Sequence, residues 1–249
     1  MTIIDKILKS REVLREILSD QGFNTDTIPK LTNKEINILF ELNSDSDIIN
    51  SLGAGASGCN FEVTHNKLPS YKINIVYLNM PNKNSNSKTT KSFRDKVFRL
   101  YDTETVDKYS LTLIIINENV SDTLEKIMDE LNISLKESME PLSDKLKKEM
   151  ESNDYHLGIN NFRRCWMLNI NTLSVNLKKH RMVSEHIPIR HENDIQKILK
   201  DCNCSKLQLP VISRNDIMSK YNLAVPGNIM KINRTSKMTG NYPFYRLVR

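Results

Sequence analysis

The sequence predicts an α/β domain over residues 1–160 and a small mixed α+β module over residues 161–249. Runs of β-branched and aromatic residues alternate with helical patterns in the first part, whereas strongly alternating strands dominate the end of the second. The charge also changes sign. Up to Asn160 there are 20 Lys and Arg against 25 Asp and Glu, and after it 16 against 5. Net charges of −5 and +11 favour two units with different partners.

The first element is an amphipathic helix. Apolar residues between Ile3 and Leu18 recur on one helical face, and Gly22 follows as an end signal. A second helix is predicted from Thr32 and Glu35, whose spacing lets each side chain cap a backbone amide of the other before the apolar residues that follow.

A sheet follows these helices. Its strands are predicted from the runs FEVTH, YKINIVYL and LTLIII, and the nearly all-apolar Leu111–Ile116 is expected to be the central strand. One helix is predicted around Phe93 and another over Leu124–Leu131. The helical period continues around Pro141, which predicts a charged, exposed helical connection over residues 134–160.

The last third combines strands with short helices. The run CWMLNI predicts a strand, an amphipathic helix follows HRMVSEHIPI, and a short helix is capped near Ser213 or Asp216. Two strands, Ile229–Arg234 and Tyr242–Val248, are joined by a turn at Gly240. The final strand alternates strictly, which is typical of a sheet with two unlike faces.

Motifs for cofactors are weak. Gly53–Gly58 spells G-x-G-x-x-G, but a strand is predicted after it where a dinucleotide site needs a helix, so a loop is favoured. Cys202 and Cys204, even with histidines upstream, lack the spacing of a structural zinc site, so reduced thiols are favoured. No cofactor and no metal is expected.

Catalysis by this chain is not expected either. Metal-dependent nucleases of α/β architecture usually place a Lys two positions after a metal-binding carboxylate, and no Asp or Glu here has that neighbour. Asp5 and Lys6 interrupt the first apolar residues, and no apolar run has the length of a membrane span. We therefore expect an intracellular protein without a membrane partner.

A basic run stands out in the otherwise acidic first part. It would attract phosphates in a salt-dependent way, although a solvated surface explains it equally well. Asp95 is the single acidic residue among its six cations, which are Lys83, Lys88, Lys91, Arg94, Lys96 and Arg99.

The ending QLPVISRNDIMSKYNLAVPGNIMKINRTSKMTGNYPFYRLVR resembles, without gaps, the C-terminal module of the fifth-subunit family of eukaryotic-type DNA-directed RNA polymerases, a family that also has an archaeal counterpart. His180, Val183 and Glu185-His186 match the motif that opens this module. The other matching positions are Gln208-Leu209-Pro210, Asp216, Tyr221, Gly227, Lys231-Ile232, Arg234, Ser236, Gly240, Tyr242 and Tyr245-Arg246-Leu247-Val248.

This resemblance implies an assembly role. In the family the module docks on the largest polymerase subunit, so residues of about 175–249 are expected to anchor the chain there. Some aromatic residues of the last strand are expected to fill the module's core as well. The implied interface residues are His186, Asp216, Tyr221, Lys231, Arg234, Ser236, Tyr242, Tyr245 and Arg246.

The N-terminal half resembles the eukaryotic jaw domain of the same family through Arg11, Ser19–Phe23 and Leu111–Ile116. That likeness implies a position beside downstream duplex DNA, with contacts to its backbone that read no sequence. Where the family has a Thr-Pro-Ser-Ala turn, this chain has Ser121-Asp122-Thr123-Leu124, and the aspartate there repels phosphates. The implied DNA-proximal residues are Lys88, Lys91, Arg94, Ser121 and Thr123.

The sequence thus predicts a non-catalytic subunit of a multisubunit DNA-directed RNA polymerase, with the largest subunit, other subunits and downstream DNA as partners. The alternative is a free-standing nucleic-acid-binding protein with the same fold. The Asn- and Lys-rich composition and the divergent jaw are also consistent with a polymerase of a large DNA virus. The expected location is therefore the nucleus, or a viral factory or virion.

Overall fold

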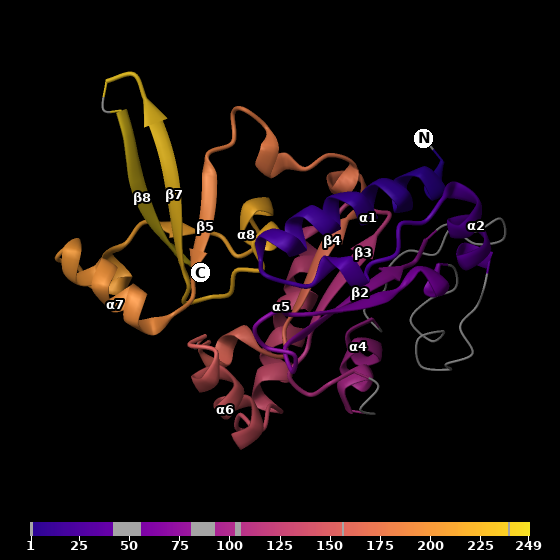
Figure 1. Cartoon of the computed structure of the whole chain (residues 1–249), viewed down its shortest axis with the longest axis horizontal. Helices are drawn as coiled ribbons and strands as arrows, with labels where there is room; N and C mark the ends of the chain where they lie inside the picture. Colours follow the sequence, from indigo (N-terminus) through magenta and orange to yellow (C-terminus); the bar gives the residue numbers. More distant parts are fainter. Residues whose placement is uncertain (1, 42–55, 81–92, 103–105, 156, 239) are drawn as a thin grey trace. The chain divides into compact units, whose positions relative to one another are not determined.

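The computed structural model in Figure 1 describes residues 2–41, 56–80, 93–102, 106–155, 157–238 and 240–249. The chain divides into two compact units, each made of two segments. The first unit comprises Met1–Pro141 and Arg163–Val175, and the second comprises Leu142–Phe162 and Asn176–Arg249. None of the described helices is both long enough and apolar enough to cross a bilayer.

The first unit contains a four-stranded sheet of mostly parallel strands. In spatial order these are β1 (Phe61–Thr64), β2 (Lys72–Leu78), β3 (Leu111–Ile116) and β4 (Cys165–Asn169), with β1 antiparallel to β2 and the others parallel. All six residues of β3 are buried. Its prediction as a central strand is confirmed.

Helices cover both faces of this sheet. On one face, α1 (Ile3–Asp20) places the Ser10 hydroxyl 2.9 Å from that of Tyr77 in β2. The opposite face packs against α4 (Phe93–Asp102) and α5 (Asp122–Glu137). A buried parallel sheet requires this double cover, because its strands are apolar on both sides.

The predicted helix boundaries rest on local signals that the structure confirms. Gly22 ends α1 with φ +86°, and a Cβ atom there would lie 2.8 Å from Nε2 of His65. At the start of α2 (Asn33–Glu41), the Thr32 amide donates to the Glu35 carboxylate at 2.7 Å, and the Glu35 amide donates back to the Thr32 hydroxyl at 3.4 Å. The reciprocal cap predicted from the sequence is therefore present.

Strand β4 shows how far apart in sequence the members of one sheet can be. It pairs with β3 in parallel, although its residues follow the predicted domain boundary at residue 160. A parallel neighbour requires a long crossover, and here the intervening chain includes α5 and α6 (Asp144–Ser152). Pro141 lies in the break between these two helices, so the predicted helical connection is realised as two separate helices.

The second unit is built on a smaller, mostly antiparallel sheet. Its spatial order is β5 (Glu185–Ile189), β7 (Ile229–Ser236), β8 (Gly240–Val248) and β6 (Val211–Ile212), with only β6 parallel to its neighbour. The unit also contains α6 from its first segment and, from its second segment, α7 (Glu192–Asp201) and α8 (Ile217–Tyr221). The predicted short helix, its Asp216 cap and both final strands are confirmed.

Short 3-10 turns connect these elements. In the first unit, one turn follows α1 (Thr25–Thr27), one precedes β1 (Ser57–Cys59) and one follows β4 (Ile170–Ser174). The turns of the second unit are Ile159–Asn161, Leu177–Lys179 and Lys206–Gln208.

Candidate functional site

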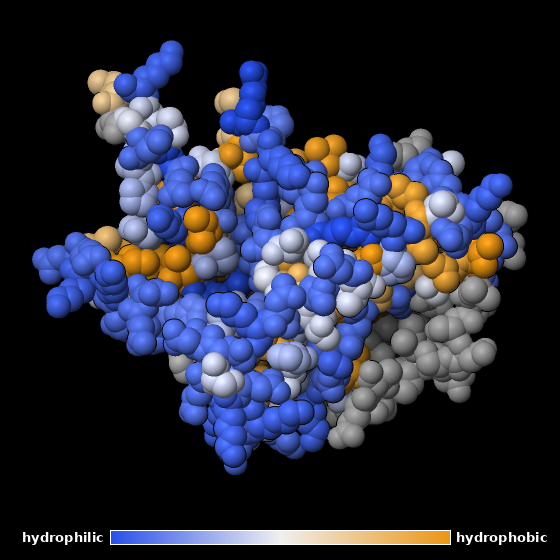
Figure 2. Space-filling view, in the orientation of Figure 1, coloured by the Kyte–Doolittle hydropathy of each residue, from blue (hydrophilic) through white to orange (hydrophobic). Residues whose placement is uncertain are grey.

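The β7–β8 hairpin of the second unit carries most of the predicted interface residues. Gly240 begins β8 with φ +67°, a conformation that favours glycine and allows the chain to reverse. Near the turn, the Thr235 hydroxyl donates to the side-chain oxygen of Asn241 at 2.8 Å. The hairpin projects in Figure 1, and Figure 2 shows apolar atoms at its otherwise hydrophilic end, where Met238 is 96% exposed.

The strand register gives this hairpin two different faces. Ile232 pairs with Phe244 and Arg234 with Tyr242, so these four side chains share one face, while Tyr245 belongs to the other. Tyr245 packs with Leu247 and Ile229 in the core cluster that includes residues of α7. Partial burial, together with nearby Cys202 and Asp201, raises the pKa of Tyr245.

Burial also changes along the hairpin. In β8 the residues Gly240–Pro243 are exposed, Phe244–Arg246 are partly buried, and Leu247 and Val248 are buried. Only the end near the C-terminus is therefore enclosed by the unit's own core. The other end leaves side chains of both strands available to a partner.

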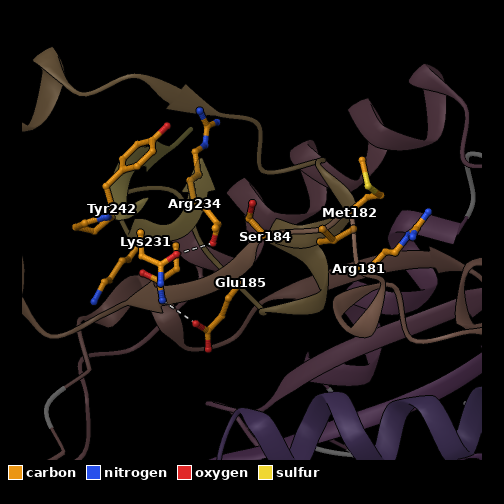
Figure 3. A pocket seen from close by; sticks show the side chains of 12 residues that line it. Arg181, Met182, Ser184, Glu185, Lys231, Arg234 and Tyr242 are labelled. Carbon is orange, nitrogen blue, oxygen red and sulfur yellow. Dashed lines mark hydrogen bonds between the residues drawn. The ribbon is translucent and has the colours of Figure 1, made fainter. Parts of the chain in front are cut away.

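An open groove of about 770 Å³ lies along this exposed end. Figure 3 shows it between the segment before β5, which contributes Arg181, Met182 and Ser184, and the hairpin, which contributes Arg234 and Tyr242. All of its lining residues belong to the second unit.

Two arginines flank an aromatic ring beside the groove. The guanidinium carbon of Arg234 lies 4.4 Å from the centre of the Phe244 ring, and that of Arg246 lies 5.3 Å from the same ring. These cation–π contacts orient the arginine side chains without neutralising their charge. Arginine and aromatic residues held in this way are typical of the residues that dominate protein interfaces.

The predicted interface residues lie in several different environments. In β5, the His186 Nδ1 atom lies 2.6 Å from the Ser184 carbonyl oxygen and donates to it. The Asp216 carboxylate accepts the Met218 amide at 2.8 Å and caps α8. Tyr221 is completely buried, so the described structure does not present it on a surface as the sequence analysis expected.

The remaining predicted interface residues are on the hairpin strands. Lys231, Arg234 and Tyr242 all line the groove. Lys231 pairs with Tyr245, so it lines the groove from the hairpin face opposite to that of Arg234 and Tyr242. Ser236 lies at the end of β7, where its hydroxyl accepts the Met238 amide at 3.3 Å. The role of all these residues in an interface stays a prediction.

Of the predicted DNA-proximal residues, the structure describes Arg94, Ser121 and Thr123, and Arg94 lies apart from the other two. The Arg94 guanidinium donates to the Glu130 carboxylate at 3.4 Å and to the Ser134 hydroxyl at 2.9 Å. Ser121 instead caps the beginning of α5, and Ser134 lies about 20 Å further along the helix at 1.5 Å per residue. Thr123 is exposed in the first turn. Lys88 and Lys91 lie outside the described residues.

Other sequence motifs form no evident site. Gly53 and Gly55 lie outside the described residues, and Gly58 belongs to a 3-10 turn that precedes β1. Cys202 is exposed and Cys204 partly buried, and both are free thiols. Within the described ranges, no three His, Cys, Asp or Glu side chains are grouped closely enough to hold a metal ion.

Sequence reasoning missed the groove itself. Arg181 and Met182 precede Lys231 by about fifty positions, so periodicity within either segment gives no sign that they line the same groove. The available signal was the basic composition of residues 178–181, which contain Lys178, Lys179 and Arg181. This composition indicates a positive charge, but it does not indicate that the segment lines a groove with the β7–β8 hairpin.

The known proteins that this chain resembles match its C-terminal part, which includes the hairpin and the groove. The family described as "RNA polymerase Rpb5, C-terminal domain" matches residues 175–248. A "DNA-directed RNA polymerase subunit Rpo5" of Methanosphaera stadtmanae is 36% identical over 77 residues, which are 31% of this chain and 99% of the relative. The Archaeoglobus fulgidus protein of the same name is 39% identical over 72 residues, 29% of this chain and 93% of the relative.

A eukaryotic relative is covered less completely. The Dictyostelium discoideum protein named "DNA-directed RNA polymerases I, II, and III subunit rpabc1" is 35% identical over 75 residues, which are 30% of this chain and 38% of the relative. The archaeal relatives are thus matched over nearly their whole length. Residues 1–174 lie outside the family match.

Proposed function

The chain belongs to the Rpb5/Rpo5 family of RNA polymerase subunits, and from this membership we propose that it is a non-catalytic subunit of a multisubunit DNA-directed RNA polymerase. The observation that carries the proposal is the near-complete coverage of archaeal Rpo5 proteins by about a third of this chain. In those organisms the matched segment corresponds to nearly a whole subunit, so it should be able to bind the polymerase without a further domain. Nucleotide addition is assigned to other subunits of the complex.

The C-terminal module, about residues 175–249, is the part that docks on the largest polymerase subunit. The exposed end of the β7–β8 hairpin supports this role, because Lys231 on one face and Arg234 and Tyr242 on the other line an open groove there. Basic charge would steer the module towards a complementary surface, and aromatic and arginine side chains would anchor it.

The first unit takes the position of a jaw beside downstream duplex DNA. Ser121 and Thr123 are exposed at the beginning of α5 and suit hydrogen bonds to a phosphate backbone. Asp122 and Glu125 in the same turn would keep this contact weak through charge repulsion. The site of action is the nucleus, or the factory or virion of a virus that encodes its own polymerase.

Affinity purification from cells that express the chain naturally tests the assembly role. We expect the intact, tagged chain to bring down two very large polymerase subunits, identified by mass spectrometry. A chain truncated after Pro226 lacks β7 and β8 and should lose them. Trp166, the single tryptophan, is 5% exposed in the first unit, so its fluorescence reports whether that unit still folds after truncation.

The outcome also separates this role from a free-standing nucleic-acid-binding protein. If the intact chain is recovered without polymerase subunits, the assembly role is wrong. Strong, salt-dependent binding of the purified chain to duplex DNA would then support the alternative, because neutralised phosphates release their counterions.

A further inference from the structure

We propose that the groove beside the β7–β8 hairpin binds an acidic, extended protein segment that also carries apolar side chains. The groove is defined here by Arg181, Met182, Ser184, Lys231, Arg234 and Tyr242. This inference rests on the proposed function, which supplies the other polymerase subunits as the source of the segment. It adds the chemical character of the docking partner and two residues, Arg181 and Met182, that the family resemblance did not single out.

The first argument is charge. Arg181, Lys231 and Arg234 all line the groove, with Lys231 on the Tyr245 face of the hairpin and Arg234 on the opposite face. Within the described part of the chain none of these three residues forms an ion pair. The one acidic lining residue, Glu185, accepts a hydrogen bond from the Asn233 side-chain amide at 2.7 Å. The groove therefore has an excess of positive charge without internal partners, and Asp or Glu side chains of a ligand would supply them.

The second argument distinguishes a protein ligand from nucleic acid. Met182 is 77% exposed and Tyr242 is 37% exposed, and both line the same groove as the cations. A phosphate backbone is held by cations and hydrogen-bond donors, whereas exposed methionine and tyrosine gain most from burial against apolar side chains. The mixture of Arg, Tyr and Met is that of a protein interface.

The third argument concerns how the segment binds. Strand β5 is an edge strand of its sheet and contains Pro188, a residue typical of edges protected against the addition of another strand. The Arg181–Ser184 segment lies just before that strand and forms one side of the groove (Figure 3). Recognition should therefore depend on the side chains in the groove.

Charge reversal in the full-length chain tests this proposal. The groove variant carries Arg181→Glu and Lys231→Glu, and the control carries Lys197→Glu and Lys200→Glu on the exposed surface of α7. Both have the same net charge, and circular dichroism checks that both fold. We expect recovery of large polymerase subunits to fall at least about tenfold for the groove variant and to stay within about twofold for the control.

Several results would overturn the proposal. Equal recovery with the groove variant and the wild type excludes the groove as the docking site, and equal loss with the control shows that only overall charge matters. If the groove variant keeps the polymerase but loses affinity for a fluorescent 20-base-pair DNA duplex, the occupant is nucleic acid. A photo-cross-linker introduced at Met182 should label an acidic subunit segment, and labelling of a basic segment would contradict the inference.

Failure of the proposed function gives a different pattern. In that case the wild-type chain itself recovers no polymerase subunits. The groove is then tested with a fluorescent twelve-residue peptide of alternating Glu and Leu. Binding that weakens at least about tenfold in the groove variant but not in the control would uphold the groove's chemistry, and equal binding to all three proteins would reject it.

Discussion

The two sheets of this protein use their surfaces in opposite ways. In the first unit β3 is buried along its whole length, and helices cover both faces of the sheet. In the second unit β8 changes from exposed at Gly240 to buried at Val248, and only one end of the hairpin joins the core. The first sheet is enclosed on both faces, whereas the second leaves one end of its hairpin exposed.

Charge follows the same division. The acidic part of the chain, residues 1–160, forms most of the enclosed unit, and the part with a net charge of +11 contains the open sheet. The family match, residues 175–248, also begins where the second unit resumes. The part of the chain that is shared with archaeal subunits therefore contains the less enclosed of the two sheets. Substitutions should therefore affect stability in one unit and assembly in the other.

The largest stability effect is expected for Asn132→Ala in the first unit. The Asn132 side chain donates to the Cys165 carbonyl at 3.0 Å and accepts the Cys165 amide at 2.9 Å, so it joins α5 to the edge strand β4. Its loss leaves two buried backbone groups without a partner and should reduce the free energy of unfolding by about 3 kcal/mol. Urea unfolding followed by Trp166 fluorescence measures this change.

The neighbouring Ile133 provides the control for that comparison. It lies on the same helix but is 57% exposed, so Ile133→Ala should change the free energy of unfolding by less than about 0.5 kcal/mol. Similar effects of the two substitutions would mean that the bridge between α5 and β4 does not hold the edge of the sheet.

The bridge also marks the limit of what the sequence predicts. Helical periodicity, the Thr32–Glu35 cap and the alternation of the last strand are signals within a few residues, and each of these elements is present. An asparagine in a helix, by contrast, gives no sign that it will meet a strand 33 residues later. Pairings between distant segments depend on the assembled core.

The candidate site shows the same limit. The family resemblance placed Lys231, Arg234 and Tyr242 in an interface, and all three line the groove, Lys231 from one face of the hairpin and the other two from the opposite face. It could not indicate the opposing segment with Arg181, because that neighbour comes from tertiary packing. Nor could it show that Arg94 engages Glu130 and Ser134 on α5.

The second prediction concerns alkaline pH. Burial raises the pKa of Cys59 to about 11 and that of Cys165 to about 12, from an ordinary value near 9. The folded state thus holds these protons more tightly than the unfolded state, so the stabilisation is complete below pH 9 and is lost as pH rises towards 11 for Cys59 and towards 12 for Cys165. Each thiol should cost the first unit about 1 kcal/mol between pH 8 and pH 10.

Urea midpoints of Trp166 fluorescence at these two pH values measure the loss. Cys59→Ala removes one of the two titrating thiols and should halve their combined contribution to the pH dependence. An unchanged pH dependence in that variant would assign the effect to other groups. Cys202 of the second unit is exposed, in contrast to the buried Cys59 and Cys165 of the first unit.

The smallest stability effect is expected for Tyr242→Ala, on the exposed end of β8. Because Tyr242 belongs to neither core cluster of the second unit, its removal should lower the free energy of unfolding by no more than about 1 kcal/mol. If the open sheet is an assembly surface, the same substitution should still reduce recovery of polymerase subunits about tenfold. Affinity purification and thermal unfolding of the same preparation measure the two quantities.

Tyr245 on the opposite face of the same strand is the matched control. It packs with Leu247 in the cluster beside α7, so Tyr245→Ala should destabilise the second unit by about 2 kcal/mol. The two tyrosines, three positions apart, would then separate binding from folding within one strand. If Tyr242→Ala instead destabilises the unit as much as Tyr245→Ala does, the exposed end of the hairpin belongs to the core after all, and the contrast between the enclosed and the open sheet fails.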